Sequence, residues 1–232
     1  MRTPIMKNII ILTCVFFSLG FATKAEETFE PLFNGNDLSG WDGNPKFWSV
    51  EEGVITGRTS SPEDLKYNEF LIWRGGEVKN FVLQAKMRVT GNNSGIHNRS
   101  EEQAEVGRWA IGGYQSDVHP KPENNAMLYH ERGRGIVGKN GQTGVGDPEG
   151  RKWLTVDRDP VAVDTAAWNE YTIIAEGNHD THKINGEIAS VTQDYDVKSR
   201  CLSGLLAIQL HKGAPMEVQM KEIRLKHLHD GD

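Results

Sequence analysis

The sequence feature that most constrains the fold is an alternation of side-chain type from Phe81 to Val89, which only Val82 interrupts. Apolar residues occupy every odd position of this segment, and Gln84, Lys86 and Arg88 lie between them. Successive side chains of a β-strand point to opposite faces of the sheet, so the pattern predicts a strand with one face in the core. Because an isolated strand is not stable, the rest of the chain must supply hydrogen-bonded neighbours.

Several other short segments have strand character and are separated by turn residues. Asn185-Gly186 is the strongest two-residue hairpin signal, because both positions of its turn need positive φ. Glu52-Gly53 predicts a second tight hairpin inside Val50–Ile55, and further strands are expected at Tyr171–Glu176 and His182–Ile184. With 25 glycines and no sustained helical periodicity, the chain is predicted to be all-β.

The final strand is expected to contain an irregularity. Apolar residues alternate from Met216 to Met220 and resume out of phase at Ile223, which predicts a bulge near Lys221 or Glu222. Segments rich in glycine, proline and charge are expected to be loops that cross an end of the sandwich, and they are Ser60–Lys66 and Asn140–Arg151.

The N-terminus has the organisation of a secretory signal peptide. Arg2 and Lys7 precede an apolar run from Ile9 to Phe21, which is shorter than the roughly 20 residues of a membrane span, and a cut is expected after Ala25. Residues 1–25 are therefore predicted to be a leader, and residues 26–232 a single periplasmic or secreted domain of a bacterium. Cys201 would be the one remaining cysteine, and it is expected to be a buried small side chain without an intramolecular disulfide.

Charge and motifs exclude several classes of function. The formal net charge of −6 provides no basic field for nucleic acid or anionic lipid, and no later segment is apolar enough to span a membrane. Neither nucleic acid nor a membrane is expected as a partner after leader cleavage. HExxH, paired CxxC, GxSxG and Walker motifs are absent from the sequence, so zinc proteases, zinc ribbons, serine hydrolases and nucleotide-binding proteins lack their usual signatures.

Three predicted strands place polar side chains on common faces. They span Trp109–His119, Met127–Arg132 and Gly204–His211. Counting by twos, the residues that share a face within each strand are Gln115, Asp117 and His119; Tyr129 and Glu131; and Gln209 and His211. Tyr114 falls on the opposite face from Gln115.

These residue types suit a carbohydrate site. Amides and carboxylates bind pairs of hydroxyl groups, and an aromatic ring supports the apolar face of a pyranose. Gln115, Asp117, Gln209, Tyr114 and the tryptophans provide those groups. The competing interpretation is a solvated sheet face, because alternating polar residues on a strand usually face water. From the residue pattern by itself, that second interpretation is the stronger one.

Metal binding is a weaker hypothesis. His97, His119 and His211, together with Asp117 or Glu131, would form a divalent-metal site if they converged. Dispersed histidines are more often polar surface residues, and no loop has the complete oxygen-ligand pattern of an EF-hand. No cofactor and no metal ligand are therefore assigned, and a calcium ion that bridges loops is left open.

The order and spacing of several motifs identify a family resemblance. The motifs are FNGNDLSGW at residues 33–41, WSVEEGVI at 48–55, NSGIHNR at 93–99, GYQSDV at 113–118, WNEY at 168–171 and GLLAIQLH at 204–211. Together they resemble the 3-keto-disaccharide hydrolase domain family over about residues 29–228. The resemblance implies a concanavalin-A-like jelly roll of two antiparallel sheets, with the carbohydrate groove on one concave sheet.

The resemblance also implies a reaction. Its substrates would be glycosides whose C3 hydroxyl has been oxidised to a ketone by a partner oxidoreductase. A C3 carbonyl acidifies the C2 proton, so that an enolate can expel the C1 oxygen by β-elimination. On this basis His211 or Asp117 is expected to be the base, and Glu131 or the other member of that pair the proton donor. Arg99 or Arg134 is expected to stabilise the oxyanion, and the residues expected to hold hydroxyls are Gln115, Gln209, Tyr114 and Tyr129.

Two alternative functions stay open. A conventional glycosidase would use Asp117 and Glu131 as opposed carboxyl groups about 5 to 9.5 Å apart. A non-catalytic lectin or carbohydrate-binding module would use the same groove without turnover, because a shared fold does not establish a shared function.

Overall fold

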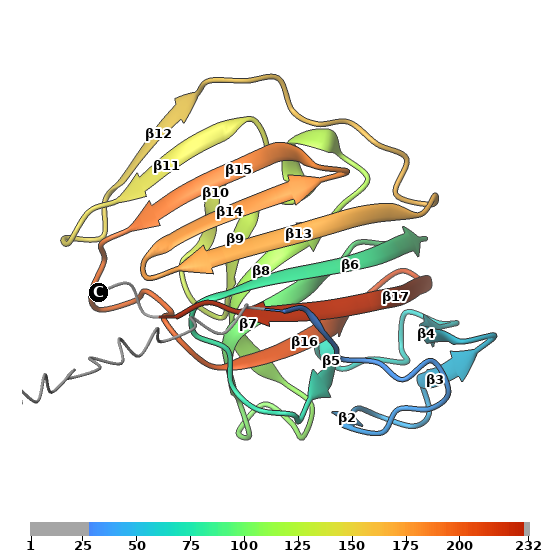
Figure 1. Ribbon diagram of the computed structural model, residues 1–232. Coiled ribbons are helices and arrows are strands. Elements are labelled where there is room, and N and C mark those ends of the chain that lie inside the picture. The colour runs from blue at the N-terminus through green and yellow to red at the C-terminus, as the bar shows by residue number, and fades with distance from the viewer. Residues whose placement is uncertain (1–27, 230–232) are drawn as a thin grey trace, which may run out of the picture.

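The computed structural model describes residues 28–229, and in it the chain forms two β-sheets packed face to face (Figure 1). The ten-stranded sheet has the order β12-β11-β15-β14-β13-β6-β17-β4-β3, and β1 also pairs with β17. Its strands are β1 (Glu30–Pro31), β3 (Trp48–Glu51), β4 (Val54–Thr59), β6 (Phe81–Thr90), β11 (Gln142–Gly146), β12 (Lys152–Val156), β13 (Asn169–Glu176), β14 (His179–Ile184), β15 (Glu187–Asp194) and β17 (Met216–His227). The predicted leader and its cleavage point lie outside the described residues.

The seven-stranded sheet has the order β10-β9-β8-β7-β16-β5-β2. Its strands are β2 (Trp41–Asp42), β5 (Glu69–Trp73), β7 (Ser94–Glu102), β8 (Ile111–Val118), β9 (Leu128–Glu131), β10 (Gly135–Gly138) and β16 (Leu205–Leu210). A short 3-10 helix, η1 (Pro122–Asn124), lies between β8 and β9. The all-β prediction is confirmed. No helix among the described residues is long and apolar enough to cross a membrane.

The main core lies between the two sheets. The apolar residues of β6 are buried at every odd position and the residues between them are partly exposed, as the alternation predicted. They pack with Ile96 of β7, Ile208 of β16 and Leu71 of β5 from the seven-stranded sheet. Because alternate side chains face opposite ways, the other residues of β7, β8 and β16 point away from the ten-stranded sheet.

The predicted turns and the predicted bulge are also confirmed. Glu52 and Gly53 have φ values of 51° and 75° between β3 and β4, and Asn185 and Gly186 have 49° and 86° between β14 and β15. The register of β17 against β6 shifts between Lys221 and Arg224, where Glu222 has a φ of 52°. The left-handed residues explain why each turn is tight and why β17 changes its alternation.

One prediction about the loops was wrong in part. Ser60–Lys66 is a loop, whereas Asn140–Arg151 contains strand β11. β11 pairs antiparallel with β12 and parallel with β15, so one contact in the sheet departs from a purely antiparallel arrangement. Glycine at position 144 leaves room for Leu154, since a Cβ there would lie 3.0 Å from Leu154 Cδ2. The glycines that suggested a loop therefore serve close packing within a strand.

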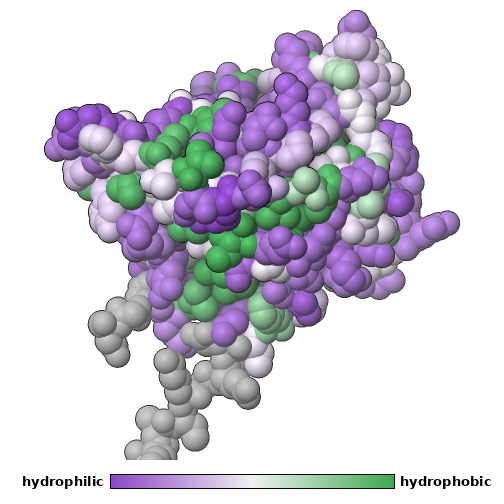
Figure 2. Space-filling view, turned by 90° about the horizontal axis from the view of Figure 1, so that it is seen from above, coloured by the Kyte–Doolittle hydropathy of each residue, from purple (hydrophilic) through white to green (hydrophobic). Residues whose placement is uncertain are grey.

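β12 ends the ten-stranded sheet and carries exposed apolar side chains. It lies uppermost in Figure 1, and Trp153 is 63% exposed, with Leu154 and Val156 exposed beside it. Figure 2, seen from above, shows apolar side chains at the surface among polar ones. Apolar atoms make up much of any folded protein's surface, and this strand begins with the charged Lys152 directly after Arg151.

A second apolar cluster forms on the outer face of the seven-stranded sheet. Phe70, Ile72 and Ala207 are buried there beneath Ile111, which begins β8. The backbone N–H of Phe70 donates to the carbonyl of Trp109 at 3.0 Å, so the segment that precedes β8 reaches across to β5. The apolar cluster and the segment before β8 thus cover part of the outer face. The rest of that face stays uncovered.

Candidate functional site

The uncovered part of the outer face contains a cavity of about 360 Å³. Its lining is strongly polar and comes from strands and connecting segments: Asn68, Asn93, Gln115, Asp117, His119, Asn124, Met127, Tyr129, Glu131, Gln209 and His211. All seven residues that the strand periodicity grouped by face are among them. These side chains line one cavity, and those that are buried, such as Gln115, Asp117 and Gln209, do not belong to a solvated sheet face.

Strand register brings the central residues together. Asp117 of β8 pairs with Gly95 of β7, and Gln115 of β8 pairs with Tyr129 of β9. Gln209 of β16 lies opposite Phe70 of β5. Directly opposed residues on one face have Cβ atoms only about 4.5 to 5.5 Å apart, so Gln115 lies beside Tyr129. The hydrogen bond from Gln115 to Asp117 places the carboxyl group next to them.

Asp117 is the most strongly perturbed carboxyl group of the cavity. It is 2% exposed, and Gln115 Nε2 donates a hydrogen bond to its Oδ1 at 2.8 Å. Burial raises its pKa to about 7, against the lowering effect of hydrogen bonds from Asn93 and Gln115. Near neutral pH the group therefore exists in both forms, so it can act as a proton donor or as an acceptor.

Glu131 provides the second carboxyl group. Burial raises its pKa, while the nearby Arg132 charge and a hydrogen bond from Asn68 oppose that shift. Asn68 Nδ2 donates to Glu131 Oε1 at 3.3 Å, and the backbone N–H of Lys212 donates to Asn68 Oδ1 at 2.9 Å. Asn68 is thereby oriented with its amide nitrogen toward the carboxyl group.

His211 is held by the backbone next to it. Its Nδ1 lies 2.7 Å from the carbonyl oxygen of Lys212. A carbonyl oxygen can only accept, so Nδ1 carries the proton and donates it to this oxygen. In the neutral ring the lone pair is then on Nε2, which is the nitrogen available to remove a proton.

Three amide oxygens of the cavity-lining residues have no hydrogen-bond partner among the described residues. They are Oε1 of Gln115, Oε1 of Gln209 and Oδ1 of Asn124, and all three are buried. Buried polar atoms are normally hydrogen-bonded, because leaving one unsatisfied costs about 1 to 3 kcal/mol. These acceptors match the hydroxyl donors of a sugar.

Three predicted site residues lie elsewhere. The guanidinium of Arg99 is buried between the sheets, where Nε donates to the carbonyl of Lys79 at 2.8 Å and Nη1 lies 3.5 Å from Asp180 Oδ2. Tyr114 and Arg134 both bond to the carboxylate of Asp194. Neither of the two arginines predicted to clamp the oxyanion lines the cavity, because the bulge in β7 turns Arg99 inward and Arg134 is held at Asp194.

The left-handed backbone of Arg99 explains its direction. Its φ is 49°, and the register between β7 and β8 shifts between Asn98 and Glu101. Such a bulge reverses the face that a side chain would otherwise occupy. The inward direction of Tyr114 needs no bulge, since the period of two residues already placed it on the face opposite Gln115.

Sequence reasoning missed the three asparagines of the lining, and one of them, Asn93, directly precedes β7. The other two are Asn68 and Asn124. Asn68 precedes β5 and Asn124 lies in η1, so neither belongs to a strand whose period could assign it a face. His97, one of the proposed metal ligands, is buried outside this lining, and burial lowers its pKa to about 3. Among the described residues no three His, Cys, Asp or Glu side chains form a group that could hold a metal ion.

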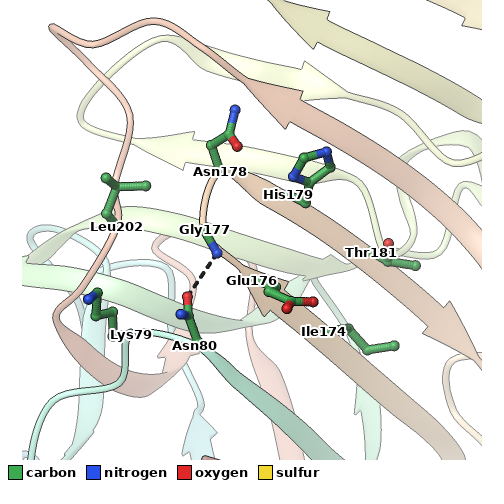
Figure 3. A pocket seen from close by; sticks show the side chains of 9 residues that line it. All are labelled: Lys79, Asn80, Ile174, Glu176, Gly177, Asn178, His179, Thr181 and Leu202. Carbon is green, nitrogen blue, oxygen red and sulfur yellow. Dashed lines mark hydrogen bonds between the residues drawn. The ribbon is translucent and has the colours of Figure 1, made fainter. Parts of the chain in front are cut away.

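A larger cavity of about 730 Å³ has a different character (Figure 3). It lies near the turn between β13 and β14, and the hydrogen bond drawn in it joins the N–H of Gly177 to Asn80 Oδ1 at 2.8 Å. Its ionisable side chains include Glu176 and His179, which come from different strands and are not bonded to each other in this view. The smaller cavity, with its two perturbed carboxyl groups, is the better candidate for chemistry.

Gly95 makes the arrangement of Gln115 possible. A Cβ at this position would lie 2.5 Å from both Cγ and Cδ of Gln115. We expect Gly95→Ala to displace Gln115 from Asp117 and to lower substrate affinity at least about tenfold, as the loss of a charge-assisted hydrogen bond does. Isothermal titration with the substrate or a competing sugar measures this.

The matched comparison is with Gln115→Ala and with the double variant. If Gly95 acts through Gln115, Gly95→Ala/Gln115→Ala binds no more weakly than Gln115→Ala. A further loss of affinity in the double variant would show that Gly95 has another role. Far-ultraviolet circular dichroism of all three variants checks that the sheets are unchanged.

Comparisons with known proteins concern the family and the fold of this chain. Residues 28–226 match a family model described as "3-keto-alpha-glucoside-1,2-lyase-like domain". None of the curated proteins matches the chain in sequence.

Solved structures share the fold at low sequence identity. A candidate glycosyl hydrolase from Parabacteroides distasonis has a TM-score of 0.59 and 18% identity, and the match covers 87% of this chain and 94% of that one. The Bacillus licheniformis β-glucanase has a TM-score of 0.54 and 11% identity, with 89% and 100% covered. The carbohydrate-binding module CBM66 of Bacillus subtilis has a TM-score of 0.54 and 12% identity, and the match covers 81% of this chain and 95% of that one. At these identities the likeness concerns the fold.

Proposed function

Because the chain belongs to the family of 3-keto-alpha-glucoside-1,2-lyase-like domains over residues 28–226, we propose that it cleaves glycosides whose C3 carries a ketone. Family membership supports a role on carbohydrate. The observation that carries the finer proposal is the cavity itself, which joins His211 to two carboxyl groups with raised pKa values. Elimination needs both a base and an acid close to one sugar, and these groups supply both.

In the proposed reaction, Nε2 of His211 removes the proton from C2 of the keto sugar. The electron pair of the C2–H bond forms a C2–C3 enolate and places negative charge on the C3 oxygen. When the enolate collapses, a C1–C2 double bond forms, the bond from C1 to the glycosidic oxygen breaks, and that oxygen receives a proton from Asp117 or Glu131. The products are an enone and the released alcohol, and addition of water to the enone makes the overall change a hydrolysis.

Neutral groups take the place of the arginine clamp. The N–H groups of the Gln209 and Asn93 side chains lie in the same cavity as the base and can donate to the C3 oxygen. A carboxyl group in its acid form can also donate, as burial allows for Asp117. Such preorganised donors stabilise the negative charge that develops on an oxygen in the transition state.

Asp117→Asn should separate proton donation from substrate binding. For a sugar leaving group we expect kcat to fall by about 10²- to 10⁴-fold, the range for general acid catalysis. For an activated nitrophenyl leaving group, which departs without a proton, the loss should be much smaller. An equal loss on both substrates would exclude Asp117 as the donor and favour Glu131.

The same role sets the pH dependence of wild-type activity. The pKa of Asp117 is raised to about 7, so its acid form predominates below that pH and is lost as pH rises through it. We therefore expect kcat for sugar leaving groups to decline above about pH 7. Stopped assays across the pH range measure the decline, and Asp117→Asn serves as the control in which the decline should be absent.

The substrate comparison tests the function as a whole. The purified domain is incubated with a chromogenic 3-keto-glucoside and with the corresponding unoxidised glucoside, and a 2-deuterated keto substrate reports whether C2–H cleavage limits the rate. Release from the keto substrate alone, slowed by deuterium, supports elimination. Release from the plain glucoside would favour a conventional glycosidase built on Asp117 and Glu131. Binding of both without release would favour a lectin-like module.

The proposed substrate has consequences for the setting of the reaction. An oxidoreductase must first convert the C3 hydroxyl to the ketone, so such an enzyme is the proposed pathway partner. The leader predicted from residues 1–25 supports export, and we propose a periplasmic or secreted location. Fractionation of cells that express the full chain tests the location by following the domain into the periplasm or the medium.

A further inference from the structure

A second cavity of about 460 Å³ adjoins the proposed active site and has cationic walls. Arg132 enters it from the turn after β9, and Lys198 and Arg200 enter it from the segment between β15 and β16. Glu131 lines both this cavity and the site cavity. The two cavities therefore share one wall residue, and a fourth cation of the wall, Arg99, is already paired with Asp180.

The three cations are not paired within the fold. None of them takes part in an ion pair among the described residues, although Arg132 acts electrostatically on Glu131. Two carboxylates line the cavity wall, and they are Glu101 and Glu131. The carboxyl group of Glu131 also accepts a hydrogen bond from Asn68. An excess of positive charge in a chain with a net charge of −6 is a local feature that its overall composition does not explain.

The other polar groups of the wall add no further negative charge. Burial raises the pKa of the Cys201 thiol to about 11, so it remains protonated. Burial and the charge of Arg134 lower the pKa of His130, so its ring is neutral near pH 7. The hydroxyls of Ser199 and Ser203 add uncharged donors to the same wall.

The segment that carries Lys198 and Arg200 is fixed in place. The carbonyl oxygen of Asp196 accepts hydrogen bonds from the N–H groups of Ser199 at 3.1 Å and Arg200 at 2.9 Å. The Asp196 carboxylate accepts from the N–H of Lys198 at 3.1 Å and from Nη1 of Arg134 at 3.3 Å. The cations are thus presented on an anchored turn, which lowers the entropy that binding would lose.

We propose that this cavity binds an anionic group, a carboxylate or a sulfate ester, carried by the part of the substrate beyond the keto sugar. Arginine side chains bind such planar or tetrahedral oxyanions through paired N–H donors. The substrate class is then a 3-keto-glycoside with an acidic aglycone. That the anion belongs to the substrate rests on the proposed function. Binding of an anion in this cavity does not depend on turnover.

The first experiment measures binding alone. Wild type is titrated with inorganic sulfate and with glucuronate by isothermal calorimetry, and the comparison is with Arg132→Gln/Arg200→Gln. The matched control is Lys66→Gln, an exposed cation outside the cavity. We expect affinity at least about tenfold weaker in the double variant and unchanged in the control, because hydrogen bonds to charged groups contribute that much. No binding by wild type, or equal binding by all three proteins, would overturn the proposal.

The second experiment identifies the source of the anion. Two 3-keto-glucosides are compared, one with a 4-carboxyphenyl and one with a 4-carbamoylphenyl aglycone, which differ in charge and little in shape. We expect KM about tenfold lower for the carboxyphenyl substrate in wild type and equal KM values in the double variant. Sulfate binding without this preference would refute an acidic substrate. If neither substrate is cleaved, calorimetry with the same two glycosides still tests the preference, so failure of the proposed function is recognised separately.

Discussion

His211→Ala is expected to lower kcat/KM on a 3-keto-glucoside by about 10²- to 10⁴-fold, the contribution of a positioned general base. The physical reason is the fixed tautomer: the Lys212 carbonyl holds the proton on Nδ1, 2.7 Å away, and leaves Nε2 to receive the proton from C2. Steady-state assays measure the loss. Exchange of the C2 hydrogen with deuterated water reports on the same step without requiring cleavage.

The control for His211 is His179→Ala, an exposed histidine on the other sheet. It should leave kcat/KM within about twofold, as surface changes usually do. If His211→Ala retains C2 exchange but loses release of the alcohol, then His211 is the donor and not the base. If it keeps both, Asp117 becomes the candidate base.

Arg99→Met is expected to destabilise the fold by about 3 to 5 kcal/mol, the range for removing one partner of a buried ion pair. Its side chain is 0% exposed and Asp180 is 1% exposed. The substitution leaves Asp180 without its counter-charge and removes the donors that serve the carbonyls of Lys79 and Cys201. Urea unfolding followed by tryptophan fluorescence measures the change.

A double variant separates charge from packing at this position. Burial raises the pKa of Asp180 to about 7, so a neutral isostere is already close to one of its natural forms. Arg99→Met/Asp180→Asn should therefore recover part of the stability that Arg99→Met loses, and more of it at pH 8 than at pH 5. A stable Arg99→Met protein with greatly reduced kcat would instead restore Arg99 as an oxyanion clamp.

The strand framework was readable from the sequence because its signals are local. Alternation in β6 and the Asn185-Gly186 turn depend on neighbours a few residues away, and the bulge near Glu222 follows from a change of phase within one strand. β11 was missed because its glycines signal a loop by composition, whereas their packing against Leu154 is a tertiary effect. The parallel pairing of β11 with β15 has no local signature at all.

The candidate site was readable to the extent that it lies on regular strands. Period two placed Gln115 with Asp117 and Gln209 with His211, and all four line the cavity. It could not place Arg99, since a single left-handed residue reverses the direction of a side chain. Asn68 was missed for a related reason: it lies just outside a strand, and only the fold brings it to Glu131. Tyr114 was predicted to bind substrate because it is aromatic, although its even position in β8 put it on the face opposite Gln115. The position in the strand was the better predictor.

The two faces of strand β8 differ in what they contact: one lines the cavity, and the other packs toward the ten-stranded sheet. Its side chains at 115 and 117 face the cavity, while those at 114 and 116 are buried toward the other sheet. A combinatorial library restricted to the cavity-facing parity should therefore retain a high fraction of folded members while it samples new substrates. Randomising the neighbouring parity would chiefly yield insoluble protein, so this strand offers a simple rule for choosing which codons to vary.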